Sequence, residues 1–207
     1  MANKKDDKYS STYYNLGTIN EITLYNINKN EGDRILKNCE SILTDIDNKM
    51  SCQISTSEIS KINENAGIDY VQVSDDTYYV IKESINFSKM SNDTFDITIG
   101  PIIDLWAIGT DNAKVPIKDE IIDKLSLVNY KNILFNDDNK SIKLAKKNMK
   151  IDLGGIAKGY AADKIYKYLK EDENLENALI NLGGNICILG NKEKNQPFSI
   201  GIQDPTK

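Results

Sequence analysis

The chain has 207 residues, 40% of them hydrophobic and 28% charged, a composition that suits a globular protein with one sizeable core or two small ones. Its formal net charge of −5 argues against a nucleic-acid binder, because neutralising phosphates needs clustered Lys and Arg. Histidine is absent, which excludes Ser-His-Asp and Cys-His catalysis and any His-ligated metal within these residues. A metal site here would use oxygen ligands, which favours Mg²⁺ or Ca²⁺ over Zn²⁺.

The cysteines and the first residues also limit the possible classes. Cys39, Cys52 and Cys187 are odd in number and widely spaced, so they predict no disulfide framework. Cys39 and Cys187 lie in apolar surroundings and are predicted to be small core residues. No apolar run of about 18 residues predicts a membrane-spanning helix. Residues 1–15 are predicted to be a disordered leader or the stub of a removed signal, because they begin with a polar stretch.

Periodicity in the first half of the chain predicts mixed elements. In order, we expect a strand, an amphipathic helix, a short helix, a strand or loop, and a further helix, over residues 19–25, 34–50, 57–63, 69–77 and 78–90. The short helix has Ser55 or Ser57 as its expected N-cap.

The second half continues the irregular alternation. In order, we expect a short helix, a hairpin, a short strand, a helix, two strands and a last strand, over residues 116–127, 133–144, 150–153, 156–170, 177–182, 185–189 and 198–202. This order predicts an α+β fold rather than a doubly wound sheet. Because a strand at 198–202 needs partners, we expect the chain to be the N-terminal portion of a longer protein, incomplete at its C-terminus.

The strongest local signal is IDLGGIAKGYAAD, residues 151–163, which predicts a strand, a tight glycine turn and a helix start. Free N–H groups at a helix start suit a phosphate. Lys158 is placed to meet a phosphate oxygen or a ribityl hydroxyl, and Asp152 to accept hydrogen bonds from a ribose, a ribityl chain or a flavin ring. The alternative is an ordinary strand–turn–helix in which Asp152 is only a local cap.

A second signal is NDTFDITIGPIIDLW, residues 92–106, in which Phe95 and Trp106 are aromatic anchors. Thr94 and Asp96 supply polar atoms beside Phe95, a combination that suits a flat heteroaromatic ligand. The alternative is a core strand followed by a Gly-Pro pair that opens a helix.

These segments occur together with LGT, SEISKIN, ALINLGGN and GIQDP, and in this order, over about residues 16–205, they resemble the ApbE-like family of FAD:protein FMN transferases. The resemblance implies an α+β, T-fold-like architecture over 16–207 as part of a single domain. It implies Mg²⁺-dependent cleavage of FAD and attachment of FMN, through a phosphoester, to a Thr or Ser hydroxyl of a target protein. Some members only hydrolyse FAD to FMN and AMP.

Matching by position implies roles for individual residues, with the catalytic group left unassigned. The implied contacts to FAD are Leu16, Thr94, Phe95, Asp96, Asp152 and Lys158. Gly155 is implied as a Mg²⁺ ligand through its carbonyl. The family often has Met at the place of Leu16, and Gln53 replaces a Tyr whose stacking contact is therefore lost.

The family continues with a His-Ile-Ile-Asp-Pro-type segment and an Asp-x-x-x-Thr-type segment that completes the Mg²⁺ ligands, and neither is in these residues. We therefore expect this piece to be inactive or unstable alone. The implied partner is an acceptor in a respiratory or electron-transfer complex, and the implied location is extracytoplasmic, as a membrane-anchored lipoprotein. Alternatives are an FAD pyrophosphatase, a flavin-binding module, or an adhesin-like or structural domain.

Overall fold

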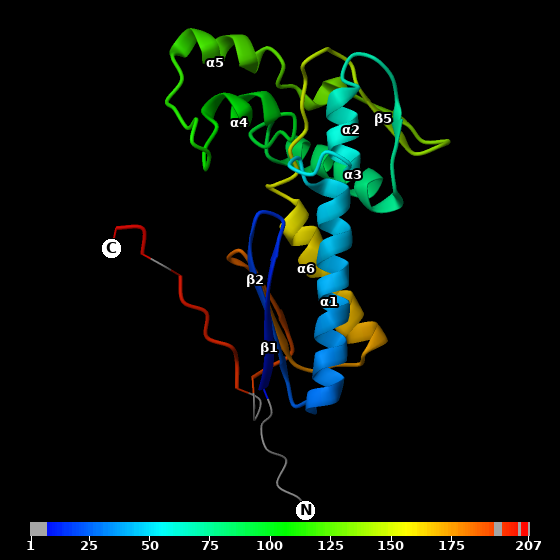
Figure 1. The fold of residues 1–207 in the computed structure, drawn as a ribbon, viewed down its shortest axis with the longest axis vertical. Coiled ribbons are helices and arrows are strands. Elements are labelled where there is room, and N and C mark those ends of the chain that lie inside the picture. The colour runs from blue at the N-terminus through cyan, green and yellow to red at the C-terminus, as the bar shows by residue number, and fades with distance from the viewer. Residues whose placement is uncertain (1–7, 193–195, 203, 207) are drawn as a thin grey trace, which may run out of the picture. The chain divides into compact units, whose positions relative to one another are not determined.

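The computed structural model describes residues 8–192, 196–202 and 204–206. Its helices and strands alternate irregularly along the chain, which confirms the α+β prediction (Figure 1). Within the range expected to be one domain, the chain divides into two compact units. The terminal unit is Met1–Thr44 with Lys158–Lys207, and the central unit is Asp45–Ala157.

The terminal unit is built on an antiparallel four-stranded sheet in the order β1-β2-β6-β7. Its strands are β1 (Lys8–Asn15), β2 (Thr18–Tyr25), β6 (Ala178–Leu182) and β7 (Asn185–Leu189). Three of them confirm predicted strands. Alternation explains the inner strands, since Ile22 and Leu24 of β2 and Ile180 of β6 are fully buried.

The prediction of a disordered leader over 1–15 is wrong for residues 8–15, which form β1. Two of its tyrosines anchor this strand to α1 (Lys29–Met50), alongside which the β1–β2 hairpin lies in Figure 1. The Tyr13 hydroxyl donates to the Leu36 carbonyl at 2.8 Å, and the Tyr9 ring packs against Gly32. A polar edge strand of this kind has no continuous apolar signal in the sequence. Residues 1–7 lie outside the described residues.

The helices of this unit each bury a stripe of apolar side chains. The predicted stripe on α1 is confirmed, because Ile35, Cys39 and Leu43 are fully buried. The helix predicted at 156–170 is α6 (Ala157–Lys167), which continues as a π-helical turn, η2 (Tyr168–Asp172). Arg34 of α1 holds Glu173 through two hydrogen bonds of 2.7 and 2.5 Å, and this pairing lowers the pKa of that carboxyl.

The central unit has a small antiparallel sheet in the order β3-β5-β4. Its strands are β3 (Val71–Gln72), β4 (Ile133–Asn136) and β5 (Ser141–Leu144). Its helical elements are α2 (Glu58–Glu64), α3 (Asp75–Met90), α4 (Gly100–Trp106), α5 (Lys118–Leu125) and the 3₁₀ turn η1 (Tyr130–Asn132). Ser57 is the N-cap of α2, as one of the two predicted caps, and accepts from the Ser60 amide.

Two predicted strands are not formed. Residues 150–153 are extended but make only one parallel bridge, from Lys150 to Ile99. Residues 198–202 form no ladder within the described parts of the chain, and Phe198 instead packs edge-on against Tyr25 at 5.6 Å between ring centroids. A β-rich composition makes a strand only where a partner edge is available to satisfy its backbone. No helix in the described residues is long and apolar enough to cross a bilayer.

The two hairpins of the terminal sheet turn through backbone conformations that favour glycine. Leu16 and Gly17 link β1 to β2 with φ angles of 55° and 68°, and Gly183 and Gly184 link β6 to β7 with 59° and 91°. Positive φ at both positions is typical of the tight turns whose twist matches antiparallel strands. The turns are also adjacent, because a Cβ added at Gly183 would lie 2.6 Å from the Thr18 Cγ2.

We predict that Gly183→Ala destabilises the protein more than Gly184→Ala. Both changes place a side chain at positive φ, which costs about 1–2 kcal/mol. Only Gly183 adds a clash, with Thr18, whereas a Cβ at Gly184 meets no atom within 4 Å. Urea unfolding of the two variants measures the difference, which we expect to exceed about 1 kcal/mol. Equal losses would contradict the close approach of the two turns.

Candidate functional site

The residues predicted to contact a ligand fall into two groups. Thr94, Phe95, Asp96, Asp152 and Gly155 belong to the central unit, whereas Leu16 and Lys158 belong to the terminal unit. The structure places each group within its own unit.

The loop that carries Phe95 is fixed by polar contacts to residues 129–131. Asp93 accepts from the Tyr130 hydroxyl at 2.6 Å and from the Lys131 ammonium at 3.0 Å, and these contacts lower the pKa of its carboxyl. The buried Thr98 hydroxyl accepts from the Asn129 amide at 2.8 Å. This loop is therefore held in a single path before α4 begins at Gly100.

Asp96 has a structural task that its predicted role did not include. One carboxylate oxygen accepts from the Thr98 amide at 2.8 Å and from the Thr98 hydroxyl at 2.6 Å. The other accepts from the Tyr130 amide at 2.9 Å. Because both oxygens accept from protein donors, the Asp96 side chain shapes the loop. Thr94 is exposed, and its hydroxyl donates a hydrogen bond to the Ser91 carbonyl.

Asp152 and Gly155 meet this loop across a short extended segment. The Asp152 amide donates to the Ile97 carbonyl at 2.8 Å, and its Oδ1 accepts from the Gly154 amide at 2.7 Å. Gly155 lies against Phe95, since an added Cβ would be 3.0 Å from the Phe95 ring. The structure thus brings an aromatic ring, a carboxylate and a glycine turn together.

Two residues on the other side of this segment were not predicted to act. Asn63, at the end of α2, bonds both backbone groups of Ile151, and the Cys52 thiol donates to the Ile151 carbonyl at 3.2 Å. Burial raises the pKa of the Cys52 thiol to about 12, and the nearby Asp152 charge adds to the effect. The sequence signal for Asn63 was its position closing SEISKIN, but a side-chain bond to a distant backbone has no local pattern.

In the terminal unit, Leu16 and Lys158 lie near the turn of the β6–β7 hairpin. Leu16 adopts a left-handed conformation that is unusual for a bulky residue, and its turn borders Gly183 through Thr18. Lys158 is in the first turn of α6, and the next residue, Gly159, faces the Asn185 amide at 3.6 Å from an added Cβ. Backbone strain such as that at Leu16 often accompanies functional turns.

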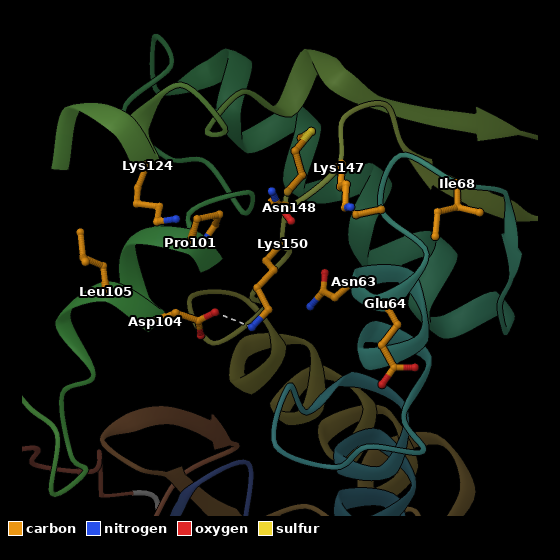
Figure 2. Close-up of a pocket in the computed structure, with 12 residues that line it drawn as sticks. Asn63, Glu64, Ile68, Pro101, Asp104, Leu105, Lys124, Lys147, Asn148 and Lys150 are labelled. Carbon is orange, nitrogen blue, oxygen red and sulfur yellow. Dashed lines mark hydrogen bonds and ion pairs between the residues drawn. The ribbon is translucent and has the colours of Figure 1, made fainter. Parts of the chain in front are cut away.

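The central unit also has a pocket of about 480 Å³ on a different set of residues. Figure 2 shows Lys124, Lys147 and Lys150 around it, with Lys150 bonded to Asp104 of α4. None of the residues predicted to contact FAD lines this pocket. It nevertheless borders the Ile151 segment, because Asn63 and Lys150 are among its lining residues.

The candidate residues offer few side chains that could coordinate a metal ion. Over the described residues, no set of three or more Cys, Asp or Glu side chains is close enough to hold one. Gly155 has only its carbonyl to offer, as the sequence predicted.

Comparison with known proteins gives one consistent relationship. The family model described as "ApbE family" matches residues 16–207. The FAD:protein FMN transferase of Haemophilus influenzae is 30% identical over 172 residues, covering 81% of this chain and 49% of that protein. The Klebsiella pneumoniae protein of the same name is 33% identical, covering 83% and 50%. The chain spans about half the length of these curated relatives.

Solved structures share the architecture. The ApbE protein from Thermotoga maritima superposes with a TM-score of 0.86 at 33% identity, covering 97% of this chain and 65% of that one. The flavin transferase ApbE from Vibrio cholerae has a TM-score of 0.87 at 23% identity, with coverage of 97% and 65%, and supports the fold alone. The mixed α+β architecture expected from the sequence is confirmed.

We predict that Asp96→Ala destabilises the protein by about 1–3 kcal/mol, because it leaves the Thr98 and Tyr130 amides without their acceptor. Thr94→Ala is the matched control on the same loop and should change stability by less than about 0.5 kcal/mol, since Thr94 is exposed. Chemical denaturation measures both. A loss for Asp96→Ala no larger than for Thr94→Ala would show that Asp96 does not organise the loop.

We also predict that Cys52 reacts slowly with an alkylating reagent: the residue as a whole is exposed, but its thiol is hydrogen-bonded to the Ile151 carbonyl. A pKa raised to about 12 keeps the thiol protonated near pH 8, and only the thiolate is nucleophilic. Mass spectrometry of labelled peptides should show Cys52 alkylated at least about ten-fold faster in urea, where its pKa returns to about 8.5. Equal alkylation rates in the folded and unfolded chain would show that the fold does not keep the Cys52 thiol protonated.

Proposed function

The chain belongs to the ApbE family, and from that premise we propose that its protein transfers FMN from FAD to a Thr or Ser hydroxyl of an acceptor protein. The relatives named above are FAD:protein FMN transferases, and the chain covers about half of each. The proposal therefore concerns the protein to which these residues belong.

The observation that carries the proposal is the placement of Phe95, Asp152 and Gly155 in the central unit. The Phe95 ring lies against Gly155, and the backbone amide of Asp152 donates a hydrogen bond to the Ile97 carbonyl, which fixes the residue. An aromatic face suits a flat flavin or adenine ring, and a carboxylate suits the hydroxyls of a ribityl chain or a ribose. Glycines beside them allow close approach to the backbone.

The proposed reaction exchanges a phosphoanhydride bond of FAD for a phosphate ester on the acceptor. The acceptor hydroxyl oxygen attacks the phosphorus of the FMN half of FAD, and its proton is released. The pyrophosphate bond to the AMP half breaks, and AMP leaves with the bridging oxygen. In this reaction Asp152 and Phe95 orient the nucleotide. A contact of Lys158 with a phosphate oxygen is proposed on the resemblance alone.

We include Mg²⁺ in the proposal because the reaction concentrates negative charge on a pyrophosphate, which a bound divalent cation would neutralise. Gly155 would contribute one carbonyl ligand. An acceptor in a respiratory or electron-transfer complex, and an extracytoplasmic, membrane-anchored location, are proposed on the resemblance alone.

The direct test incubates the protein, as its gene encodes it, with FAD, Mg²⁺ and an acceptor that bears the target hydroxyl. Flavin fluorescence on the acceptor band in a denaturing gel, lost with EDTA, is the expected result. Release of AMP and FMN without labelling would replace the transferase by an FAD pyrophosphatase. Absence of any FAD binding would contradict both activities.

We predict that Asp152→Ala weakens FAD binding by about ten-fold or more, equivalent to about 1.4 kcal/mol. Asp152→Asn should lose less, because its amide oxygen can still accept from the Gly154 amide and preserve the turn. Isothermal titration with FAD measures the affinities. The control is Asp138→Ala, which removes one negative charge from an exposed position in the β4–β5 hairpin. A similar loss of FAD affinity in this variant would show that only net charge matters.

A further inference from the structure

The amide of Asn63 bonds both polar backbone groups of one residue. Its Oδ1 accepts from the Ile151 amide at 2.7 Å, and its Nδ2 donates to the Ile151 carbonyl at 3.0 Å. A neighbouring strand would offer the same donor and acceptor pair. The Asn63 side chain therefore takes the place of a strand along this edge of the Ile151 segment.

The opposite edge of the segment is already occupied by backbone. Lys150 bridges Ile99, and the Asp152 amide donates to Ile97. In an extended chain, successive residues present their backbone groups to opposite edges, so Ile151 faces away from the 97–99 stretch. Without Asn63, the Ile151 amide and carbonyl would lose their hydrogen bonds to the Asn63 side chain, although the Ile151 side chain is fully buried.

The Asn63 side chain is itself carried on a fixed support. Its helix α2 begins at Ser57, whose hydroxyl accepts from the Ser60 amide at 2.9 Å and donates to the Ser51 carbonyl at 2.7 Å. Ile59 and Ile62 anchor the helix in the core. The Cys52 thiol adds a further donor to the Ile151 carbonyl from the turn that precedes α2.

We propose that Asn63 is a positioning residue for Asp152: it fixes the Ile151 peptide, with support from Cys52, and so sets the direction in which the next residue presents its carboxylate. Asp152 is the group proposed to contact FAD, so the ligand in this inference rests on the proposed function. Asn63 acts through Ile151 and need not touch the nucleotide.

The first test is a double-mutant cycle on FAD affinity, measured by titration. Asn63→Leu keeps the shape of the side chain and removes both hydrogen bonds. We expect it to weaken FAD binding by about ten-fold in the native background and by less than about two-fold in an Asp152→Ala background. Equal losses in the two backgrounds would overturn the proposal, because a general structural defect would not depend on Asp152.

Three further variants guard against a misfolded Asn63→Leu protein. Cys52→Ala removes one donor from the Ile151 carbonyl and leaves Asn63 intact, so a loss of about two- to three-fold is expected, whereas Cys52→Ser retains a donor and should bind like the native chain. Asn65→Ala is the matched control, since the Asn65 side-chain amide donates to the Lys61 carbonyl of its own helix end and not to the Ile151 segment. A loss in Asn65→Ala as large as in Asn63→Leu would contradict the proposal.

A second readout needs no FAD and separates this inference from the proposed function. Hydrogen exchange of the Gly154 amide reports the turn in which Asp152 Oδ1 accepts from it. We expect exchange to accelerate at least about ten-fold in Asn63→Leu and to stay unchanged in Asn65→Ala. Acceleration in a chain that does not bind FAD would keep the positioning role and discard the flavin; unchanged Gly154 exchange would discard the positioning role.

Discussion

The candidate site depends on one short extended segment, residues 150–152, which is satisfied along both edges by different means. Backbone from the Ile97 stretch pairs with one edge, and the Asn63 side chain pairs with the other. The segment is therefore held like the central strand of a sheet although it forms no strand of its own. This arrangement fixes Asp152 at the point where the chain leaves the segment and enters the glycine turn.

The same constraint joins the two sequence motifs physically. Ile97 belongs to the loop that carries Phe95, and that loop is held in turn by Asp93 and Asp96 on residues 129–131. Two acidic residues of the motif thus organise the polypeptide, while Phe95 and Asp152 present the ring and the carboxylate. The pocket lined by Lys124, Lys147 and Lys150 shares Lys150 and Asn63 with the support of this segment, but neither Phe95 nor Asp152 lines it.

Much of the fold was predictable where periodicity is long or turn chemistry is strict. The stripe of α1, the hairpin of β4 and β5, and the Ser57 cap follow from local pattern. Strand β1 was missed because its fixing contacts come from tyrosines on a polar edge, and residues 198–202 were overpredicted because composition cannot supply a partner strand. Phe95 and Asp152 were identified through motifs, but the bonds of Asn63 to Ile151 span 88 residues and leave no local signature.

The central claim is that a flavin nucleotide binds against Phe95 and the Asp152–Gly155 turn. Titration of the isotopically labelled chain with FAD, followed by backbone amide NMR, tests it most directly. We expect the largest shifts at the amides of Phe95, Asp152, Gly154 and Gly155, with small changes at Lys124 and Lys147. Shifts confined to the lysine-lined pocket, or no shifts at saturating FAD, would contradict it.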